Sequence, residues 1–203
     1  MKTWSINGLP ANVPIVVEDQ LLADCVRGKS RAQYRLYSLC YSFMMSVCIR
    51  YTASRDDAED LLNRSFLKIL SNIEKYRKEV PFGLWVRRIT INTIIDEYRK
   101  NRKEKEMTEL VDFDEQEVES DTAAINGFLE KTDAEQLQRL IDHLPEMSRK
   151  VLNLFVVDGY GHKEISEMLN ISEGTSKWHL NNARTKLKEL ITKFLPHFKT
   201  LAS

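Results

Sequence analysis

The chain has 203 residues, of which 42% are hydrophobic and 30% are charged, as in a soluble globular protein. Its 30 basic and 30 acidic side chains cancel, which argues against a protein that coats nucleic acid through net charge alone. Only 7 glycines and 5 prolines occur, and no alternating strand pattern of useful length is present. The composition therefore favours an all-α fold.

The cysteines and the apolar runs indicate the compartment. Cys25, Cys40 and Cys48 form no CxxC pair and are odd in number, so we expect buried reduced thiols rather than a disulfide framework or a zinc site. The N-terminus lacks the apolar core of a signal peptide, and no run reaches the roughly 18 apolar residues of a membrane helix. These features predict a cytoplasmic protein without membrane insertion.

The first half of the chain predicts a flexible arm followed by a helical domain. Residues 1–19 have no helical period, whereas residues 20–103 contain four amphipathic segments. The second segment is apolar around much of its circumference, so we expect it at the core. The expected boundaries are an end of the first helix near Gly28, N-caps at Ser30 and Ser54, and a fourth helix opened by Pro81.

An acidic linker and a second helical domain follow. Residues 104–131 hold nine acidic residues and one lysine within their first eighteen positions, a composition typical of a flexible linker. The second domain, residues 132–195, begins at a predicted capping box of Thr132 and Glu135. Its first helix is expected to bury Leu137, Leu140, Ile141 and Leu144, and the next to run from Pro145 to Asp158-Gly159.

Residues 159–190 predict a helix-turn-helix. Gly161 with Glu164 can begin the first helix, Asn170 can end it in the left-handed conformation, and Ser172 can cap the second. The second helix has an apolar seam formed by Leu180, Ala183, Leu187, Leu190 and Phe194. Its opposite face carries Lys177, Trp178, Asn181, Asn182 and Arg184. This face suits a DNA major groove, and an ordinary helical hairpin with a solvated face is the alternative.

Two further stretches suggest binding surfaces. Around the fourth segment, basic and aromatic residues alternate, as in sites that stack on unpaired bases. We interpret Phe82, Trp85 and Ile89 as core, and predict nucleic-acid contacts for Tyr76, Arg77, Lys78, Arg88 and Asn92. The acidic run 56–60 that opens the third segment is either a solvated helix N-terminus or a docking surface for a basic partner.

The sequence contains no arrangement of residues that points to catalysis. Its histidines, at positions 143, 162, 179 and 197, have no nucleophile or metal-ligand spacing beside them. No glycine-rich phosphate-binding motif occurs either. We therefore expect that the protein is not an enzyme and that it needs no cofactor and no metal.

Two groups of motifs, in a fixed order, carry a family resemblance. The first group is Asp57-Ala58-Glu59-Asp60-Leu61, followed by Phe82, Trp85, Ile89, Asn92, Asp96 and Arg99. The second is Leu144-Pro145 with Arg149, then Glu164-Ile165-Ser166-Glu167, Ser172-Glu173-Gly174-Thr175 and Ala183-Arg184-Thr185-Lys186-Leu187. Over about residues 21–190 the chain resembles an extracytoplasmic-function (ECF) sigma factor of the sigma-70 family.

The resemblance implies a promoter-specificity subunit of RNA polymerase. Residues 20–103 would be sigma region 2, binding the clamp helices of the largest core subunit through Asp57, Glu59, Asp60 and Asn63. The same domain would recognise and melt the −10 element, capturing an unpaired base with the loop after the third helix and Asn92 behind it. The linker would follow a positively lined channel of the polymerase.

The same resemblance makes residues 132–195 sigma region 4, seated on the β flap. Its −35 contacts would come from Thr175, Lys177, Trp178, Asn181, Asn182 and Arg184. The family pattern has valine where Ser176 stands, and basic or aromatic residues are common at His179, Asn181 and Asn182. An anti-sigma factor is an implied partner.

A stand-alone helix-turn-helix regulator, with a first domain that senses a ligand or dimerises, is the alternative. The first domain distinguishes the two, because a sensor has no need for an acidic helix beside a basic and aromatic loop.

Overall fold

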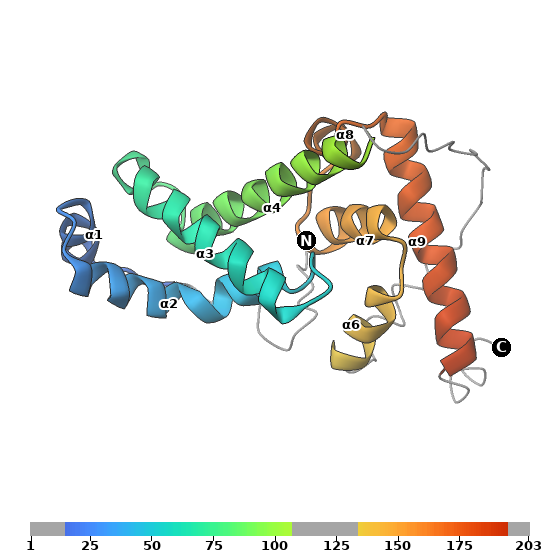
Figure 1. The fold of residues 1–203 in the computed structure, drawn as a ribbon, viewed down its shortest axis with the longest axis horizontal. Coiled ribbons are helices and arrows are strands. Elements are labelled where there is room, and N and C mark those ends of the chain that lie inside the picture. The colour runs from blue at the N-terminus through green and yellow to red at the C-terminus, as the bar shows by residue number, and fades with distance from the viewer. Residues whose placement is uncertain (1–14, 107–133, 195–203) are drawn as a thin grey trace. The chain divides into compact units, whose positions relative to one another are not determined.

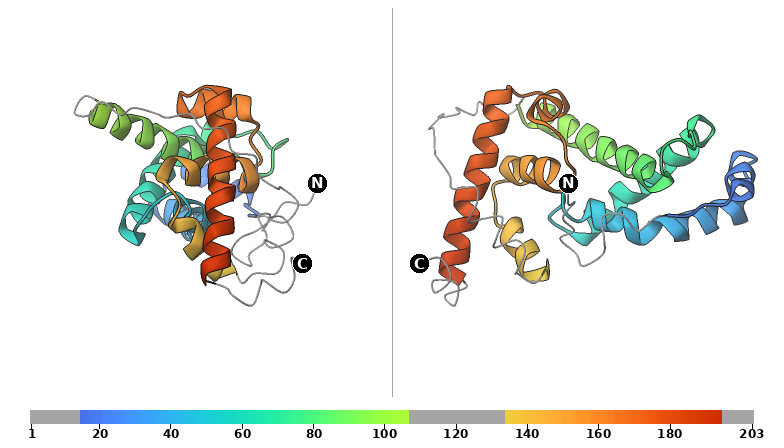
Figure 2. Two further views of the ribbon diagram at one scale, coloured as in Figure 1. Left: turned by 90° about the vertical axis from the view of Figure 1, so that its right-hand side faces the viewer. Right: turned by 180° about the vertical axis from the view of Figure 1, so that it is seen from behind.

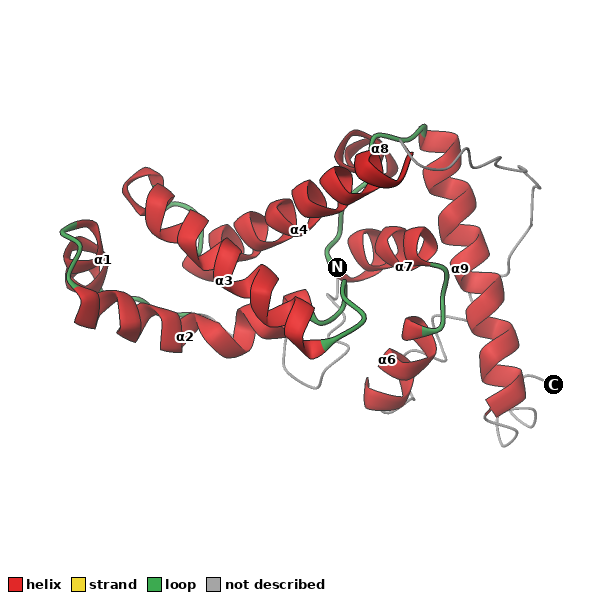
Figure 3. Cartoon of the chain, viewed as in Figure 1, coloured by secondary structure: helices red, strands yellow, loops and turns green. Residues whose placement is uncertain are grey.

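The computed structural model describes residues 15–106 and 134–194, and every regular element in these ranges is a helix (Figures 1 and 3). The all-α prediction is confirmed for these residues. They form two compact units, which we call the N-terminal unit (15–106) and the C-terminal unit (134–194). The predicted arm up to residue 14, the acidic linker beyond Glu106 and the predicted cap at Thr132 lie outside the described residues.

The N-terminal unit is a helical bundle built around its second helix. Its elements are α1 (Asp19–Val26), α2 (Ser30–Cys48), α3 (Arg55–Asn72), a 3₁₀ turn η1 (Ile73–Lys75) and α4 (Phe82–Glu106). Helix α2 packs against α1, α3 and α4, and the right-hand view of Figure 2 shows α2, α3 and α4 from behind. Its largest fully buried side chains are Leu36, Met44, Val47, Leu62, Ile69, Val86 and Ile91. The prediction that α2 lies at the core is confirmed, although Tyr34 on the same helix is 73% exposed.

Local signals set the helix ends of this unit. Gly28 adopts a φ of +73°, which a glycine tolerates without strain, and turns the chain between α1 and α2. The predicted N-cap at Ser30 is wrong: Lys29 holds that position, because its carbonyl accepts the first helical bonds of α2. The cap at Ser54 is confirmed, with the Asp57 amide donating to Ser54 Oγ over 3.1 Å. Pro81 directly precedes α4, and its carbonyl accepts the first helical hydrogen bonds.

The C-terminal unit packs three short helices against one long one. Its elements are α6 (Ala134–Asp142), α7 (Glu146–Leu152), a π-helical turn η2 (Asn153–Val157), α8 (His162–Leu169) and α9 (Glu173–Phe194). Helices α6, α7 and α8 all contact α9. The buried apolar side chains include Leu140, Ile141, Leu144, Val151, Leu154, Ile165, Leu169, Leu180, Ala183 and Leu187. The predicted seam of α9 is thus confirmed at its first three positions, Leu180, Ala183 and Leu187, whereas Leu190 is half-buried.

The helix that follows Pro145 departs from the expected regular form. After Leu152 the chain widens into the π-helical turn, in which the Asp158 amide donates to the Asn153 carbonyl over 2.9 Å. Gly159, with a φ of +79°, then ends the element where the sequence predicts. The turn directs Phe155 toward α8, where its ring stacks on His162.

The three cysteines are free and buried, as predicted. Burial raises the pKa of the Cys40 and Cys48 thiols to about 12. None of the helices in the described ranges is both long and apolar enough to cross a membrane.

Candidate nucleic-acid interface and acidic surface

Tyr76 closes the loop of residues 75–80. Its hydroxyl donates to the carbonyl oxygen of Val80 over 2.8 Å. Its ring centroid lies 5.1 Å from that of Phe82 and 5.2 Å from that of Trp85, both in the first turn of α4. The loop is therefore braced from inside by one half-buried aromatic residue, and it lies against the helix that carries the other predicted −10 residues.

The predicted cations of this region lie at the surface. Arg77 and Lys78 are exposed on the loop, and Arg88 and Asn92 are exposed one turn apart on the same face of α4. Lys78 Nζ lies 2.7 Å from Asp19 Oδ2, but both side chains are about 70% exposed. Such a surface pair contributes at most about 1 kcal/mol, so a phosphate could replace the carboxylate.

The aromatic and aliphatic residues predicted as core are only partly so. Phe82 is buried, with 5% of its surface exposed, whereas Trp85 and Ile89 are half-buried. Trp85 belongs to the Tyr76–Phe82–Trp85 cluster, in which the Phe82 and Trp85 centroids lie 5.6 Å apart. This cluster gives the loop an apolar foundation.

The acidic end of α3 is held by partners within the unit. Asp57 accepts a 2.6 Å hydrogen bond from Ser54 Oγ, and Glu59 accepts 3.2 Å hydrogen bonds from Tyr41 and Arg55. Asp60 pairs with Arg64 at 2.7 Å. Part of the acid that the sequence shows here therefore serves helix capping and ion pairing.

Two side chains connect this acidic surface to neighbouring helices. Asn63 is exposed, and its Oδ1 accepts a 3.0 Å hydrogen bond from the Tyr37 hydroxyl of α2. Arg64 also reaches Glu97 of α4 at 2.8 Å, and its hydrogen bonds to Glu97 and Asp60 raise the pKa of the Arg64 guanidinium. Residues 57–63 thereby lie on a platform formed by α2, α3 and α4.

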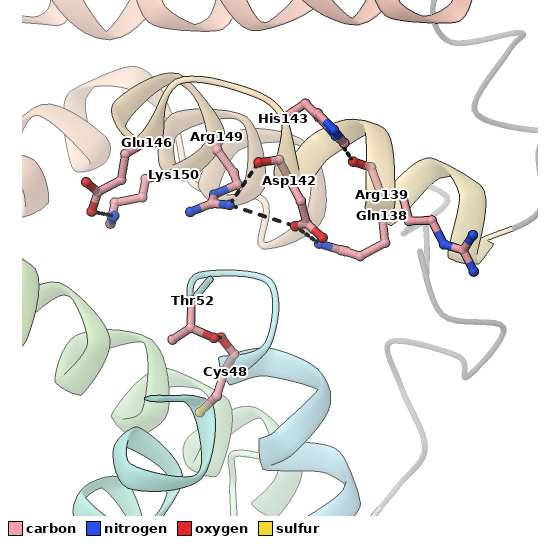
Figure 4. A network of polar contacts seen from close by, with 9 residues as sticks. All are labelled: Cys48, Thr52, Gln138, Arg139, Asp142, His143, Glu146, Arg149 and Lys150. Atoms are coloured by element: carbon pink, nitrogen blue, oxygen red, sulfur yellow. Dashed lines mark hydrogen bonds and ion pairs between the residues drawn. The ribbon is translucent and has the colours of Figure 1, made fainter. Parts of the chain in front are cut away.

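The corner between α6 and α7 is stabilised by Arg149, the arginine that follows the leucine-proline pair (Figure 4). Its Nη1 donates to the carbonyl oxygen of Asp142 over 3.4 Å and lies 3.8 Å from the carboxylate of the same residue. A cation at the C-terminus of α6 also interacts favourably with the helix dipole. Lys150, on the next position of α7, pairs with Glu146 one turn earlier.

The helix-turn-helix has the capping geometry that its sequence predicts. The Gly161 amide donates to Glu164 Oε2 over 2.9 Å at the start of α8. Asn170 ends α8 with a φ of 54°, in the left-handed region. The Thr175 amide donates to Ser172 Oγ over 2.9 Å at the start of α9.

The six residues of α9 that are predicted to contact the −35 element differ in how exposed their side chains are. Lys177 is exposed, whereas the other five, Thr175, Trp178, Asn181, Asn182 and Arg184, are half-buried. Partial burial lowers the pKa of Arg184. Asn182 is turned toward α7, because its Nδ2 donates to Ser148 Oγ over 3.2 Å.

The inner side of α9 contains polar residues that were not anticipated as a group. Ser176 has no exposed surface, and His179 is 5% exposed. His162 Nδ1 lies 2.9 Å from Ser176 Oγ, and Ser148 Oγ lies 3.1 Å from His179 Nδ1. Ser176 precedes Leu180 by four residues, and residues four apart lie on the same face of a helix. The spacing of the apolar seam therefore already indicated that Ser176 points inward.

His162 lies at the contact between α8, η2 and α9. Its ring stacks on Phe155 with a centroid distance of 4.6 Å and an interplanar angle of 25°. Burial lowers the pKa of His162, and the nearby charges of Lys177 and Arg184 lower it further. These effects favour the neutral form of the imidazole.

Comparison with known proteins identifies both units. Residues 36–104 match the family model of sigma-70 region 2, and residues 134–187 match that of sigma-70 region 4. The chain is 32% identical to the RNA polymerase sigma factor SigZ of Bacillus subtilis (strain 168) over 133 residues, 66% of this chain and 72% of that protein. It is 27% identical to the ECF RNA polymerase sigma factor SigW of the same organism over 161 residues, 76% of this chain and 82% of that one.

Among solved structures, the chain is similar to the sigma factor RpoE of Bartonella quintana, which was crystallised with the anti-sigma factor NepR. The sequence identity is 18% and the TM-score is 0.47, over 78% of this chain and 96% of that one.

The two region matches lie in the order that the motifs predict and at the two units described above. The chain therefore belongs to the sigma-70 family, as an ECF RNA polymerase sigma factor.

Proposed function

We propose that the N-terminal unit of this sigma factor reads and opens the −10 element through the 75–80 loop and α4, and that α9 reads the −35 element. Promoter recognition by regions 2 and 4 is the function of the family. Sigma factors are not enzymes, which agrees with the absence of catalytic motifs. The braced loop, followed by a helix on which Arg88 and Asn92 are exposed, is the observation that carries the assignment of the −10 site.

Base capture requires a loop that is formed before the base arrives. Flipping a base out of the duplex costs a few kcal/mol, and ordering a loop at the same time would add to that cost. The Tyr76 hydroxyl and ring hold the loop closed in the free protein. Arg77 and Lys78 then contact the phosphates, and Arg88 and Asn92 lie on the adjacent face of α4 to receive the unpaired strand.

The −35 contacts come from one helix with few cations. Lys177 and Arg184 contact phosphates, and Thr175, Trp178 and Asn181 approach base edges in the major groove. Two phosphate contacts give a salt dependence with a slope of only about −2 in log affinity against log salt. We therefore expect the free protein to bind promoters weakly at physiological salt, with the core polymerase supplying the remaining affinity.

The acidic surface of α3 is the proposed contact with the core polymerase. Asp57, Glu59, Asp60 and Asn63 lie on one platform and face solvent in part, which suits the clamp helices of the largest subunit. Following the family resemblance, the C-terminal unit docks on the β flap, and an anti-sigma factor is a further partner. Residues 104–131 are proposed as a linker between the predicted domains 20–103 and 132–195. The buried free thiols support a reducing compartment, the cytoplasm.

Transcription from a promoter library tests the proposal. Purified full-length protein and core polymerase transcribe templates randomised at the −10 and −35 positions, and the transcripts are sequenced. We expect Arg88→Ala and Asn92→Ala to reduce −10-dependent initiation, and Lys177→Ala to reduce −35-dependent initiation. Arg31→Ala, an exposed cation in the first turn of α2, is the matched control.

Different results would separate the competing functions. A stand-alone regulator would bind specific DNA without the core polymerase and would give no promoter-dependent transcripts with an active core. Full activity of both Arg88→Ala and Asn92→Ala would refute the −10 site. Wild-type protein that selects no −35 sequence would refute the role of α9.

A further inference from the structure

Two histidine–serine pairs join α9 to the two helices that precede it. Ser148 of α7 contacts His179 of α9 at 3.1 Å, and His162 of α8 contacts Ser176 of α9 at 2.9 Å. Ser148 and Ser176 have no exposed surface, and His179 has 5%. Both contacts lie in the first two turns of α9.

The pair at Ser148 is extended by a third residue. Asn182 Nδ2 donates to Ser148 Oγ over 3.2 Å, so one hydroxyl connects two side chains one turn apart on α9. With the His179 proton on Nε2, Nδ1 accepts the hydrogen of that hydroxyl while the hydroxyl oxygen accepts from Asn182, so the three side chains form one continuous chain of hydrogen bonds. Trp178 packs its ring edge-on against His179, with centroids 4.8 Å apart. The same network thus contacts one of the proposed −35 residues.

We propose that Ser148 and His179, together with His162 and Ser176, are positioning residues that set the rotation of α9 about its axis and thereby its −35 specificity. In the same proposal Asn182 acts through Ser148 rather than on DNA. The inference rests on the proposed function of α9 and deepens it. None of the four residues is expected to touch a base.

The physical reason is the difference between apolar and polar contacts. Apolar packing is non-directional, whereas a hydrogen bond weakens steeply when its angle falls below about 120°. Side chains of a helix end about 5–6 Å from its axis, so a rotation of about 20° moves a reading atom by about 2 Å. That displacement is several times the width of the 2.7–3.2 Å interval of donor–acceptor distances at which a hydrogen bond to a base edge forms. Directional contacts from α7 and from α8 therefore fix the positions of the atoms that read DNA.

The test compares promoter preferences of full-length variants in transcription with core polymerase on the −35-randomised library. Ser148→Ala and His179→Leu remove the network, and both are expected to shift or broaden the selected −35 sequences. The discrimination at affected positions should fall about tenfold, the amount that one well-placed base contact provides. Ile141→Val, a change at a buried residue of α6, is the control for a loss of thermal stability, which it should produce to a similar extent. Thr192→Ala removes a hydroxyl that donates to the Lys188 carbonyl of the same helix. Both controls should keep the wild-type −35 preference.

A double mutant isolates the role of Asn182. If Asn182 acts through Ser148, Asn182→Ala in the Ser148→Ala background changes the −35 preference no further. An additional loss in the double mutant would mean that Asn182 contacts DNA, and would overturn that part of the proposal.

The outcomes also separate this inference from the proposed function. Variants of Ser148 and His179 that lower the melting temperature yet select wild-type −35 sequences would refute the positioning role and leave −35 reading by α9 intact. Wild-type protein that selects no −35 sequence would refute the proposed function itself. If His179→Leu does not fold, Ser148→Ala and Asn182→Ala decide the question by the same measurement.

Discussion

The hydroxyl of Tyr76 provides the sharpest test of the −10 site, because bracing and stacking predict opposite results for Tyr76→Phe. The substitution keeps the ring contacts at 5.1 and 5.2 Å and removes only the 2.8 Å bond to the Val80 carbonyl. A hydrogen bond of this kind contributes about 1 kcal/mol, which corresponds to about a fivefold change in the population of the closed loop. We therefore expect open complexes to form up to about fivefold more slowly with Tyr76→Phe.

The assay is the reactivity of unpaired thymines to permanganate after mixing holoenzyme with a promoter. Because the bond closes a surface loop and not the core, the melting temperature of the free protein should fall by less than about 4 °C. Tyr34→Phe is the matched control, since that residue is 73% exposed. Wild-type opening by Tyr76→Phe, with strong loss in Tyr76→Ala, would refute the bracing role and show that the ring itself stacks on the captured base.

Three further predictions concern stability. The pKa of His162 is lowered in the folded protein, so the unfolded chain binds more protons below about pH 6.5. The C-terminal unit should therefore lose stability as the pH falls through that range. His162→Phe should reduce this pH dependence when unfolding is followed by circular dichroism at pH 7.5 and 5.5. Ser54→Ala removes the N-cap of α3 and should cost about 1 kcal/mol in urea unfolding, whereas Ser54→Asp should restore most of it. Because the pKa of the Cys40 and Cys48 thiols is about 12, only about one in ten thousand of them is ionised at pH 8. Both thiols should therefore react with Ellman's reagent only when the protein unfolds. A fast reaction in the native protein would contradict their burial.

Helices and their ends were predictable because their signals are local. Ser54, Asn170 and Ser172 each act within four residues of their own position, and all three behave as predicted. The exception is Ser30, which has the right residue type one position too late. The turn at Gly28 places Lys29, not Ser30, at the N-cap position of α2, so the conformation of the adjacent turn overrode the residue preference of the cap.

The residues of the candidate site were identifiable by type, but not their partners. Tyr76 was recognised as an aromatic residue beside cations, yet no sequence pattern indicates that its hydroxyl donates to the Val80 carbonyl. Lys78 and Asp19 are 59 residues apart, and Ser148 and His179 are 31 apart. Such pairs form only when the helices pack, so their existence depends on the tertiary structure and not on a sequence period.

The departures at Ser176 and His179 gain a physical explanation from this packing. In the family pattern the position of Ser176 carries valine, which would stabilise the hairpin by apolar burial. Here a serine and a histidine are buried instead, and each has a hydrogen-bond partner, so the exchange costs little net stability. A rotation of α9 that broke these hydrogen bonds would leave the same groups unsatisfied, at a cost of about 1–3 kcal/mol each. Other rotations of α9 about its axis are therefore disfavoured. A reading helix with few cations benefits most from such a device, because its discrimination depends on where its side chains lie more than on how strongly it attracts DNA.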